Sequence, residues 1–443
     1  MQPAVHIDLG TVLGAVAAVG VERFVGIPFA PSPTGERRFA RAVESRAPFA
    51  GGVLNATVPG APCIQNPLGD PRPPGHEEAP PPSEDCLFLN IHRPANTPPN
   101  AQLPVMVWAF GGGLCGGYAS NAQFNASQLA LQQGVIVVTV SYRLGALGFL
   151  PLGSLPGIDF DGGGSGGMNG LHDVVVGLRW VQRQIGAFGG RASDVTLFGE
   201  SSGSYLSCVL SVSPRALGLF TRAALQSGPC AGGPPTPSGQ GWGPSSTAFA
   251  RNVSRRVLST LNVSTLAGLR AVPAERVQWP DELMNDLVVA PYFSGYFEDS
   301  YANQAKAKPS QAKPRQATPS PLCRYVVDGA PEAAWKAGAI VPSALIVGYT
   351  SKDGTSAFYG TAPTLGNIPP DPKQTDAAAY QAALAAAWGK HAAAVEMQYP
   401  LAEYDGSPQA AYIQADADAF VICPAFAIAR WAAQAGLDVW SCA

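Results

Sequence analysis

The stretch that decides the fold is Val195-Thr196-Leu197-Phe198-Gly199-Glu200-Ser201-Ser202-Gly203. Its first four residues are apolar or β-branched and predict a strand, Gly-x-Ser-x-Gly predicts a tight turn, and residues 202–212 can continue as a helix. On such a turn a serine is held in a strained conformation, and the helix behind it points N–H groups toward developing negative charge. The pattern therefore predicts that Ser201 is a nucleophile; the alternative is a tight glycine turn without chemistry.

A second Gly-x-Ser-x-Gly match surrounds Ser165, at residues 163–167. It lies inside a glycine run and no strand pattern precedes it. Because the strand is what presents the serine, we interpret this second match as a decoy.

Short apolar runs alternate with helical patterns along the rest of the chain. Strands are predicted at residues 105–109, 135–140 and 344–347, and helices at 171–185, 377–397 and 411–435, the last with a kink or break at Pro424. Strands that alternate with helices indicate an α/β fold with a mostly parallel sheet and helices on both faces.

Composition excludes several classes of protein. Charged residues make up 13% of the 443 residues and the net charge is −3, so no basic surface suggests nucleic-acid binding. No apolar run is long enough for a transmembrane segment. None of the eight cysteines forms a Cys-x-x-Cys pair, which argues against a zinc site. Residues 303–321 are rich in Lys, Pro, Gln and Ser and are predicted to be a disordered insertion.

Several blocks resemble one family. Phe188-Gly189-Gly190, followed after four residues by 195–203, is similar to the serine signature of the type-B carboxylesterases, the family of carboxylesterases and cholinesterases. Residues 84–94, 141–150 and 24–30 resemble further blocks of the same family, in the same order. The resemblance implies an α/β-hydrolase fold in which residues 1–443 form a single domain.

A glycine run follows the predicted strand at 105–109. Small residues let backbone N–H groups approach a reacting carbonyl oxygen, and the resemblance implies an oxyanion hole made by the N–H groups of Gly112, Gly113 and Ser202. Many family members have His before these glycines, and this chain has Phe110. The alternative is a plain flexible turn.

The resemblance implies that Asp353 is the acid of a catalytic triad. Asp353 lies in the segment 348–354 after a predicted strand, where the family usually has Glu. A carboxylate there would orient an imidazole. The alternative is a solvated aspartate, because Asp-Gly is also an ordinary turn pair. Ser227 is a candidate for supporting this acid.

The sequence shows no clear candidate for the general base of the catalytic triad. Only His391 follows Asp353, among five histidines, and it lies in a predicted helix. The family places its catalytic histidine after the strand matched here by Val439-Trp440. Because the chain ends at Ala443, we expect that the histidine-bearing C-terminal segment is absent and that the chain is truncated relative to the family.

The resemblance also implies structural pairs. It matches Cys63 and Cys86 to a family disulfide, with two free thiols as the alternative if the protein is cytosolic, and it matches salt bridges between Arg38 and Glu84 and between Arg143 and Asp173. Cys208 is expected to be a buried apolar residue on the helix after the nucleophile turn.

The resemblance implies a serine carboxylic-ester hydrolase that acts through an acyl-enzyme on Ser201, with no metal or organic cofactor and with a small carboxylic ester as its partner. The sequence does not indicate which ester. The alternatives are a catalytically inactive cholinesterase-like binding protein or an inactive truncated product. Four Asn-x-Ser/Thr sequons favour a glycoprotein of the secretory pathway, although no signal peptide is visible; otherwise the protein is cytoplasmic. They stand at Asn55, Asn125, Asn252 and Asn262.

Overall fold

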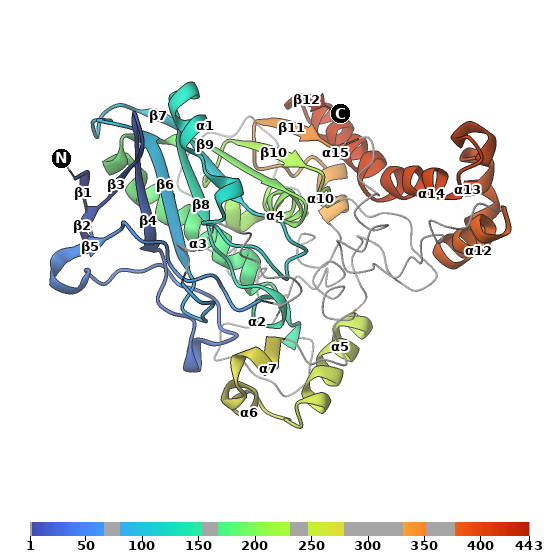
Figure 1. Ribbon diagram of the computed structural model, residues 1–443, viewed down its shortest axis with the longest axis horizontal. Helices are drawn as coiled ribbons and strands as arrows, with labels where there is room; N and C mark the ends of the chain where they lie inside the picture. The colour runs from blue at the N-terminus through green and yellow to red at the C-terminus, as the bar shows by residue number, and fades with distance from the viewer. Residues whose placement is uncertain are drawn as a thin grey trace.

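The computed structural model describes residues 2–65, 80–152, 167–230, 247–278, 331–350 and 377–442. Its centre is a nine-stranded sheet with the strand order β12-β11-β10-β9-β7-β8-β6-β4-β3 (Figure 1). The predicted insertion at 303–321 and the glycine run around Ser165 lie outside the described residues.

Six neighbouring strands of this sheet are parallel. They are β7 (Leu103–Ala109), β8 (Ile136–Val140), β9 (Gly190–Glu200), β10 (Arg222–Gln226), β11 (Ala344–Gly348) and β12 (Asp438–Cys442). All five residues of β8, Ile-Val-Val-Thr-Val, are buried. A run without polar alternation is what a strand covered on both faces requires.

Antiparallel strands complete the sheet. β6 (Phe88–Pro94) pairs with β8, β4 (Val21–Pro28) with β6, and β3 (Ala15–Ala18) with β4. A separate three-stranded sheet contains β1 (Ala4–Ile7), β2 (Gly10–Leu13) and β5 (Val53–Asn55).

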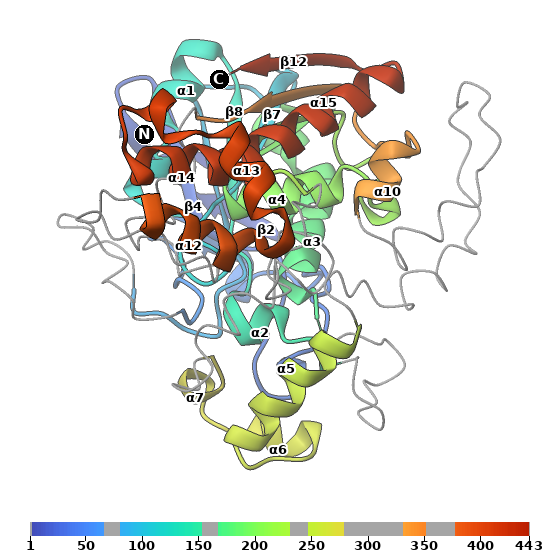
Figure 2. The same ribbon diagram turned by 90° about the vertical axis from the view of Figure 1, so that its right-hand side faces the viewer.

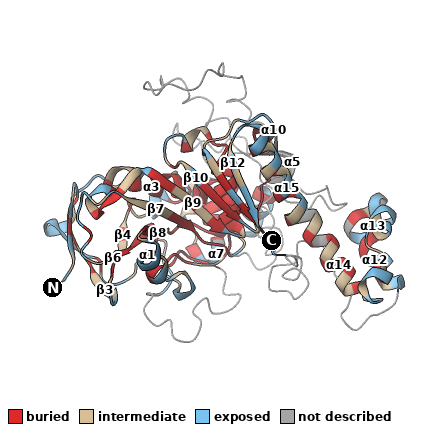
Figure 3. Cartoon of the chain, turned by 90° about the horizontal axis from the view of Figure 1, so that it is seen from above, coloured by how far each residue is buried: buried red, intermediate tan, exposed pale blue. Residues whose placement is uncertain are grey.

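Helices connect the parallel strands and cover both faces of the sheet. α1 (Ser127–Gln133) leads from β7 to β8, α3 (Asn169–Gln184) from β8 back to β9, and α4 (Ser202–Leu210) from β9 to β10. Right-handed crossovers that run in opposite directions place their helices on opposite faces. α1 and α3 accordingly lie on opposite sides of the sheet (Figure 3). α15 (Cys423–Gln434) packs on β11 and β12, and α10 (Pro331–Lys336) packs on α15.

Two of the three smaller apolar clusters in the described residues lie among helices beside the main core. Helices α5 (Thr247–Thr260), α6 (Leu266–Ala271) and α7 (Ala274–Gln278) pack with α2 (Gly145–Phe149), and α12 (Ala377–Trp388), α13 (Ala392–Gln398) and α14 (Pro408–Ala417) form another group (Figure 2). Within the described parts of the chain, no helix combines the length and apolar character needed to cross a bilayer.

The predicted α/β fold with a mostly parallel sheet is confirmed. The helix boundaries differ in the Ala-rich region, because a 3-10 turn at Gly389–His391 separates α12 from α13. A π-helical turn at Asp418–Ile422 separates α14 from α15, and Pro424, which has no N–H to donate, lies in the first turn of α15. The predicted break is therefore a junction between two helices.

Candidate active site

Ser201 stands on the sharp turn between β9 and α4. Its backbone has φ 53° and ψ −124°, a combination that L-residues adopt only when their surroundings impose it. Two hydrogen bonds impose it here, since the Ser201 N–H donates to the carbonyl of Gln226 at 2.8 Å and its carbonyl accepts from the N–H of Tyr205 at 2.9 Å. The turn is therefore held from both sides.

Glycines make room for this turn. A Cβ on Gly199 would lie 2.5 Å from the carbonyl carbon of Gly203, and a Cβ on Gly203 would lie 2.5 Å from the carbonyl oxygen of Phe110. Both glycines of Gly-x-Ser-x-Gly are thus required by close backbone packing between β9, α4 and the segment after β7.

The glycine run after β7 folds beside Ser201. An ideal Cβ on Gly111 would lie 3.1 Å from the Ser201 Cβ, and Gly112 and Gly113 have φ values of 116° and 65° that favour glycine. Ser202 is the first residue of α4, so its N–H has no partner within the helix. Among the residues that the structure describes, no acceptor binds the N–H groups of Gly112, Gly113 or Ser202. Within the described residues these three N–H groups therefore have no acceptor, and Gly111, which precedes two of them, packs against Ser201.

An aromatic pair supports the start of the glycine run. The rings of Phe110 and Tyr142 stack at 4.3 Å between centroids, and the Tyr142 hydroxyl donates to the Phe110 carbonyl at 2.6 Å. Burial raises the pKa of Tyr142 well above its ordinary value, so the hydroxyl keeps its proton. Tyr142 belongs to one of the blocks that resemble the family, but nothing in the sequence pattern indicated this hydrogen bond.

Strands β10, β11 and β12 end at the edge of the sheet that carries Ser201. Gln226 of β10 pairs with both Glu200 and Gly348, and Gly348 pairs with Cys442. The N–H of Ser227 also donates to the Gly348 carbonyl at 2.8 Å. The predicted strand at 344–347 is present as β11, while Asp353 lies outside the described residues.

The described histidines lie elsewhere. His92 is on β6, which runs antiparallel to β8, and it pairs near the start of β8, away from the edge that carries Ser201. Burial, followed by the charge of Arg23, lowers the pKa of His92 to about 4. His172 is buried in α3, and its pKa falls to about 3 for the same first reason. His391 is exposed and lies in the 3-10 turn between α12 and α13 rather than inside a helix, and His6 hydrogen-bonds Thr11. In the described parts of the chain, none of these rings contacts Ser201.

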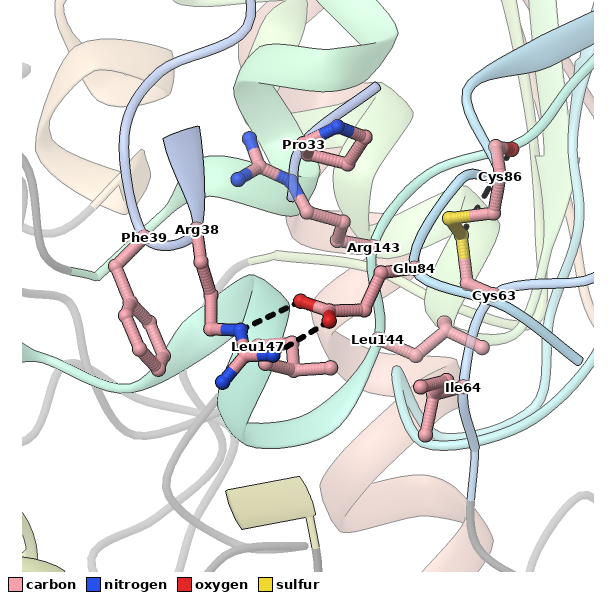
Figure 4. Close-up of a pocket in the computed structure, with 10 residues that line it drawn as sticks. All are labelled: Pro33, Arg38, Phe39, Cys63, Ile64, Glu84, Cys86, Arg143, Leu144 and Leu147. Atoms are coloured by element: carbon pink, nitrogen blue, oxygen red, sulfur yellow. Dashed lines mark hydrogen bonds and ion pairs between the residues drawn. A yellow bond between two sulfur atoms is a disulfide. The ribbon is translucent and has the colours of Figure 1, made fainter. Parts of the chain in front are cut away.

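The predicted structural pairs are confirmed, and Cys63, Cys86, Arg38, Glu84 and Arg143 line one small pocket (Figure 4). Cys63 and Cys86 form a disulfide. Arg38 binds Glu84 through two hydrogen bonds of 2.6 and 2.5 Å.

A second buried ion pair lies nearby. The Arg143 guanidinium binds the Asp173 carboxylate at 2.8 and 2.7 Å. All of the Asp173 side chain is shielded from solvent, so the pair has no water to replace a missing partner.

The predicted burial of Cys208 is confirmed, and the structure adds a disulfide that the sequence did not indicate. Cys208 is buried in α4, as expected, and it forms a disulfide with Cys230, which follows β10. The two residues are separated by a helix and a strand, and only the crossover brings them together. Among the described cysteines, Cys115 and Cys423 are free.

A central, mostly parallel sheet with a strained serine between a strand and a helix, beside unused backbone donors, defines an α/β hydrolase. The model of the carboxylesterase family matches residues 1–443, and the chain belongs to this family.

Known relatives agree with this assignment. The chain is 43% identical over 213 residues to pyrethroid hydrolase Ces2e from Rattus norvegicus, which is 47% of this chain and 35% of that protein. It is 42% identical over 209 residues to para-nitrobenzyl esterase from Bacillus subtilis, which is 47% of this chain and 40% of that protein. The solved structure of a thermophilic PNB esterase has a TM-score of 0.71 and 29% identity, and the match covers 100% of this chain and 79% of that one. The sequence matches thus span well under half the length of these curated relatives, and nothing in them supports the inactive alternative.

Proposed function

We propose that the protein is a serine carboxylic-ester hydrolase in which Ser201 is the nucleophile. The observation that carries the proposal is the strained turn at Ser201, which lies beside the unused N–H groups of Gly112, Gly113 and Ser202. Membership of the carboxylesterase family supports it. The nine-stranded sheet joins strands from both ends of the sequence, which supports a single domain over residues 1–443.

The reaction would proceed through an acyl-enzyme. The Ser201 hydroxyl oxygen attacks the ester carbonyl carbon, and the resulting oxyanion accepts hydrogen bonds from the three backbone donors. Collapse of this intermediate expels the alcohol, and water then releases the acid from Ser201. Removal of one such donor typically costs about 10²–10³ in kcat.

Attack at neutral pH requires a general base. We assign Asp353 the role of orienting a histidine, because the segment after β11 begins at the edge where Ser201 stands. Since the described histidines do not reach Ser201, the base belongs to a histidine outside this set. This histidine would have to lie at the same edge of the sheet, where β12 also ends.

We further propose that the protein matures in the secretory pathway. Two disulfides, Cys63–Cys86 and Cys208–Cys230, are stable in oxidising compartments and rare in the cytosol.

In a form of the protein that carries the catalytic histidine, turnover of p-nitrophenyl acetate and labelling by a fluorophosphonate test the assignment of Ser201. Wild type is compared with Ser201→Ala and, as the matched control, Ser165→Ala in the other Gly-x-Ser-x-Gly match. We expect Ser201→Ala to lose both turnover and label and Ser165→Ala to keep both. A label that survives Ser201→Ala and maps to Ser165 would contradict the proposal.

A further inference from the structure

We infer that Gln65 is a positioning residue for the oxyanion hole; the inference rests on the proposed function of the glycine run. Gln65 is nearly buried and lies far in sequence from Gly117, with which it makes two hydrogen bonds. Its side-chain oxygen accepts from the Gly117 N–H at 2.9 Å, and its Nε2 donates to the Gly117 carbonyl at 3.3 Å. The side-chain amide of Gln65 therefore hydrogen-bonds both the N–H and the carbonyl of Gly117.

The remaining donor of the amide is also used. Nε2 donates to the Cys63 carbonyl at 3.1 Å, so the oxygen and both N–H groups of Gln65 have partners. Only one orientation of the amide satisfies all three bonds, because the reverse orientation would face Nε2 toward an N–H and the oxygen toward two carbonyls. The side chain is thus fixed in both position and orientation.

The backbone segment that carries Gln65 is held in place by covalent and hydrogen bonds. Cys63 is bonded to Cys86 through the disulfide and pairs with Ser83, whose N–H donates to the Pro62 carbonyl at 2.8 Å. Cys86 leads directly into β6 of the central sheet. The position of Gln65, and through it that of Gly117, is therefore fixed relative to the central sheet.

Close packing transmits this position to the donors. Gly117 has φ 102°, and a Cβ on it would lie 2.7 Å from the Gly111 carbonyl oxygen. Gly111 in turn packs against Ser201, and the Gly112 carbonyl accepts from the N–H groups of Cys115 and Gly116 at 3.1 and 3.0 Å. A shift of Gly117 would therefore displace Gly111 and Gly112 directly.

Gln65→Glu is the informative variant because it keeps the shape of the side chain and replaces the donor Nε2 with an oxygen, which can only accept. The carboxylate can still accept from the Gly117 N–H, but its second oxygen would face the carbonyls of Cys63 and Gly117, which Nε2 approaches at 3.1 and 3.3 Å. Gln65→Met, which removes the polar atoms at similar length, is the second variant in case the first folds poorly.

Gln182 of α3 offers a matched control. Its Nε2 donates to the carbonyls of Ala192 and Leu219, both at 2.8 Å, so Gln182→Glu creates the same conflict of oxygen atoms. Ala192 lies near the start of β9 and Leu219 shortly before β10, at the edge of the sheet opposite Ser201.

Hydrogen exchange measured by mass spectrometry on the full chain tests the inference without relying on activity. We expect amides in residues 111–118 to exchange about tenfold faster or more in Gln65→Glu and Gln65→Met, and at the wild-type rate in Gln182→Glu. Unchanged exchange in both Gln65 variants, or equal acceleration in Gln182→Glu, would overturn the inference.

Turnover of p-nitrophenyl acetate, measured in a form of the protein that carries the catalytic histidine, supplies the second readout. We expect both Gln65 variants to lower kcat at least about tenfold with little change in KM, as for a loss confined to the transition state, and Gln182→Glu to leave both unchanged. Faster loop exchange with wild-type kcat would overturn the link to catalysis. Wild-type protein without Ser201-dependent turnover would instead reject the proposed function, and the exchange data alone would then decide whether Gln65 holds the loop.

Discussion

Gly228 packs directly onto the backbone of Ser201. A Cβ on Gly228 would overlap the Ser201 carbonyl oxygen and would lie 2.7 Å from the Ser204 Cβ. The Ser204 hydroxyl also donates to the Gly228 carbonyl at 3.0 Å. The segment after β10 thus forms one wall of the nucleophile turn.

We therefore expect Gly228→Ala to displace the nucleophile turn. The added methyl group cannot be accommodated by a side-chain movement, because its neighbour is backbone, and misplacement of a reacting group by about 1 Å can cost about 10²-fold in rate. The measurement is kcat for p-nitrophenyl acetate. Gly186→Ala is the control, since a Cβ there meets nothing within 4 Å; similar rates in the two variants would contradict the expectation.

In a form of the protein that carries the catalytic histidine, Asp353→Asn should lower kcat by orders of magnitude, up to about 10⁴, because an amide favours the wrong tautomer of that histidine. KM should change little. The exposed Asp405, which has φ 54°, provides the same substitution at a turn position that Asn tolerates. A near-normal kcat for Asp353→Asn would make Asp353 an ordinary turn residue.

Removing one partner of the buried ion pair should be costly. Asp173→Ala would leave the Arg143 guanidinium without its carboxylate, and also the Arg143 N–H that donates to Asp173 at 3.0 Å. We expect a loss of about 3–5 kcal/mol in the free energy of unfolding, measured by urea titration. Arg46→Ala is the comparison, because the Arg46 side chain is 67% exposed in its pair with Glu44 and should contribute less than about 1 kcal/mol. Equal losses would show that Asp173 is not held as described.

The buried histidines should make the protein sensitive to acid. The folded-state pKa values of His92 and His172 are about 4 and about 3, and both lie below the ordinary value of 6.5. Below pH 6.5 the unfolded chain therefore binds protons at these two histidines, while the folded chain leaves them neutral. Stability is therefore complete above pH 6.5 and falls toward pH 4, by up to about 1.4 kcal/mol per pH unit for each histidine.

Urea midpoints between pH 7 and pH 4 measure this slope. We expect His92→Gln to flatten the slope by roughly one proton's contribution, whatever it does to stability at pH 7. The same substitution at the exposed His391 is the control. An unchanged slope in His92→Gln would mean that His92 is protonated in the folded protein.

The four sequon asparagines should carry glycans when the protein is expressed in a secretory system. Asn55, Asn125, Asn252 and Asn262 are all exposed. The Asn125 oxygen accepts from the Ser127 N–H at 3.0 Å, which leaves the amide nitrogen, the atom that is glycosylated, pointing away from that bond. Removal of N-glycans should lower the mass in steps that Asn→Gln substitution abolishes one by one; a mass equal to that of the bare chain would exclude modification.

Sequence patterns predicted those structural features that depend on residues close together in the chain. The run from Val195 to Gly203 contains the strand, the turn and the helix start, so the position of Ser201 could be predicted. The bond between Cys208 and Cys230 could not, because it depends on how α4 lies against the segment after β10. Gln65 and Gly117 are likewise 52 residues apart, and a glutamine near a cysteine gives no sign of which backbone it will bind.

The helix boundaries show a different limit. The region from Ala377 to Gln398 is so rich in alanine that it lacks an amphipathic period. Helical propensity was evident there, and the glycine that ends α12 was a local signal that the prediction did not use. Gly389 follows Trp388 directly and has φ 51°, a left-handed conformation that favours glycine at the end of a helix.

The central place of β9 has a consequence for synthesis on the ribosome. β7 and β8 can pair as soon as residue 140 has emerged, but the other edge of β7 stays open until β9, which begins at residue 190, becomes available. At roughly 5–20 residues per second, translation of these fifty residues takes several seconds. During that time an unpaired apolar strand edge is exposed to other nascent chains, so this interval is where chaperones would most affect the yield of folded protein.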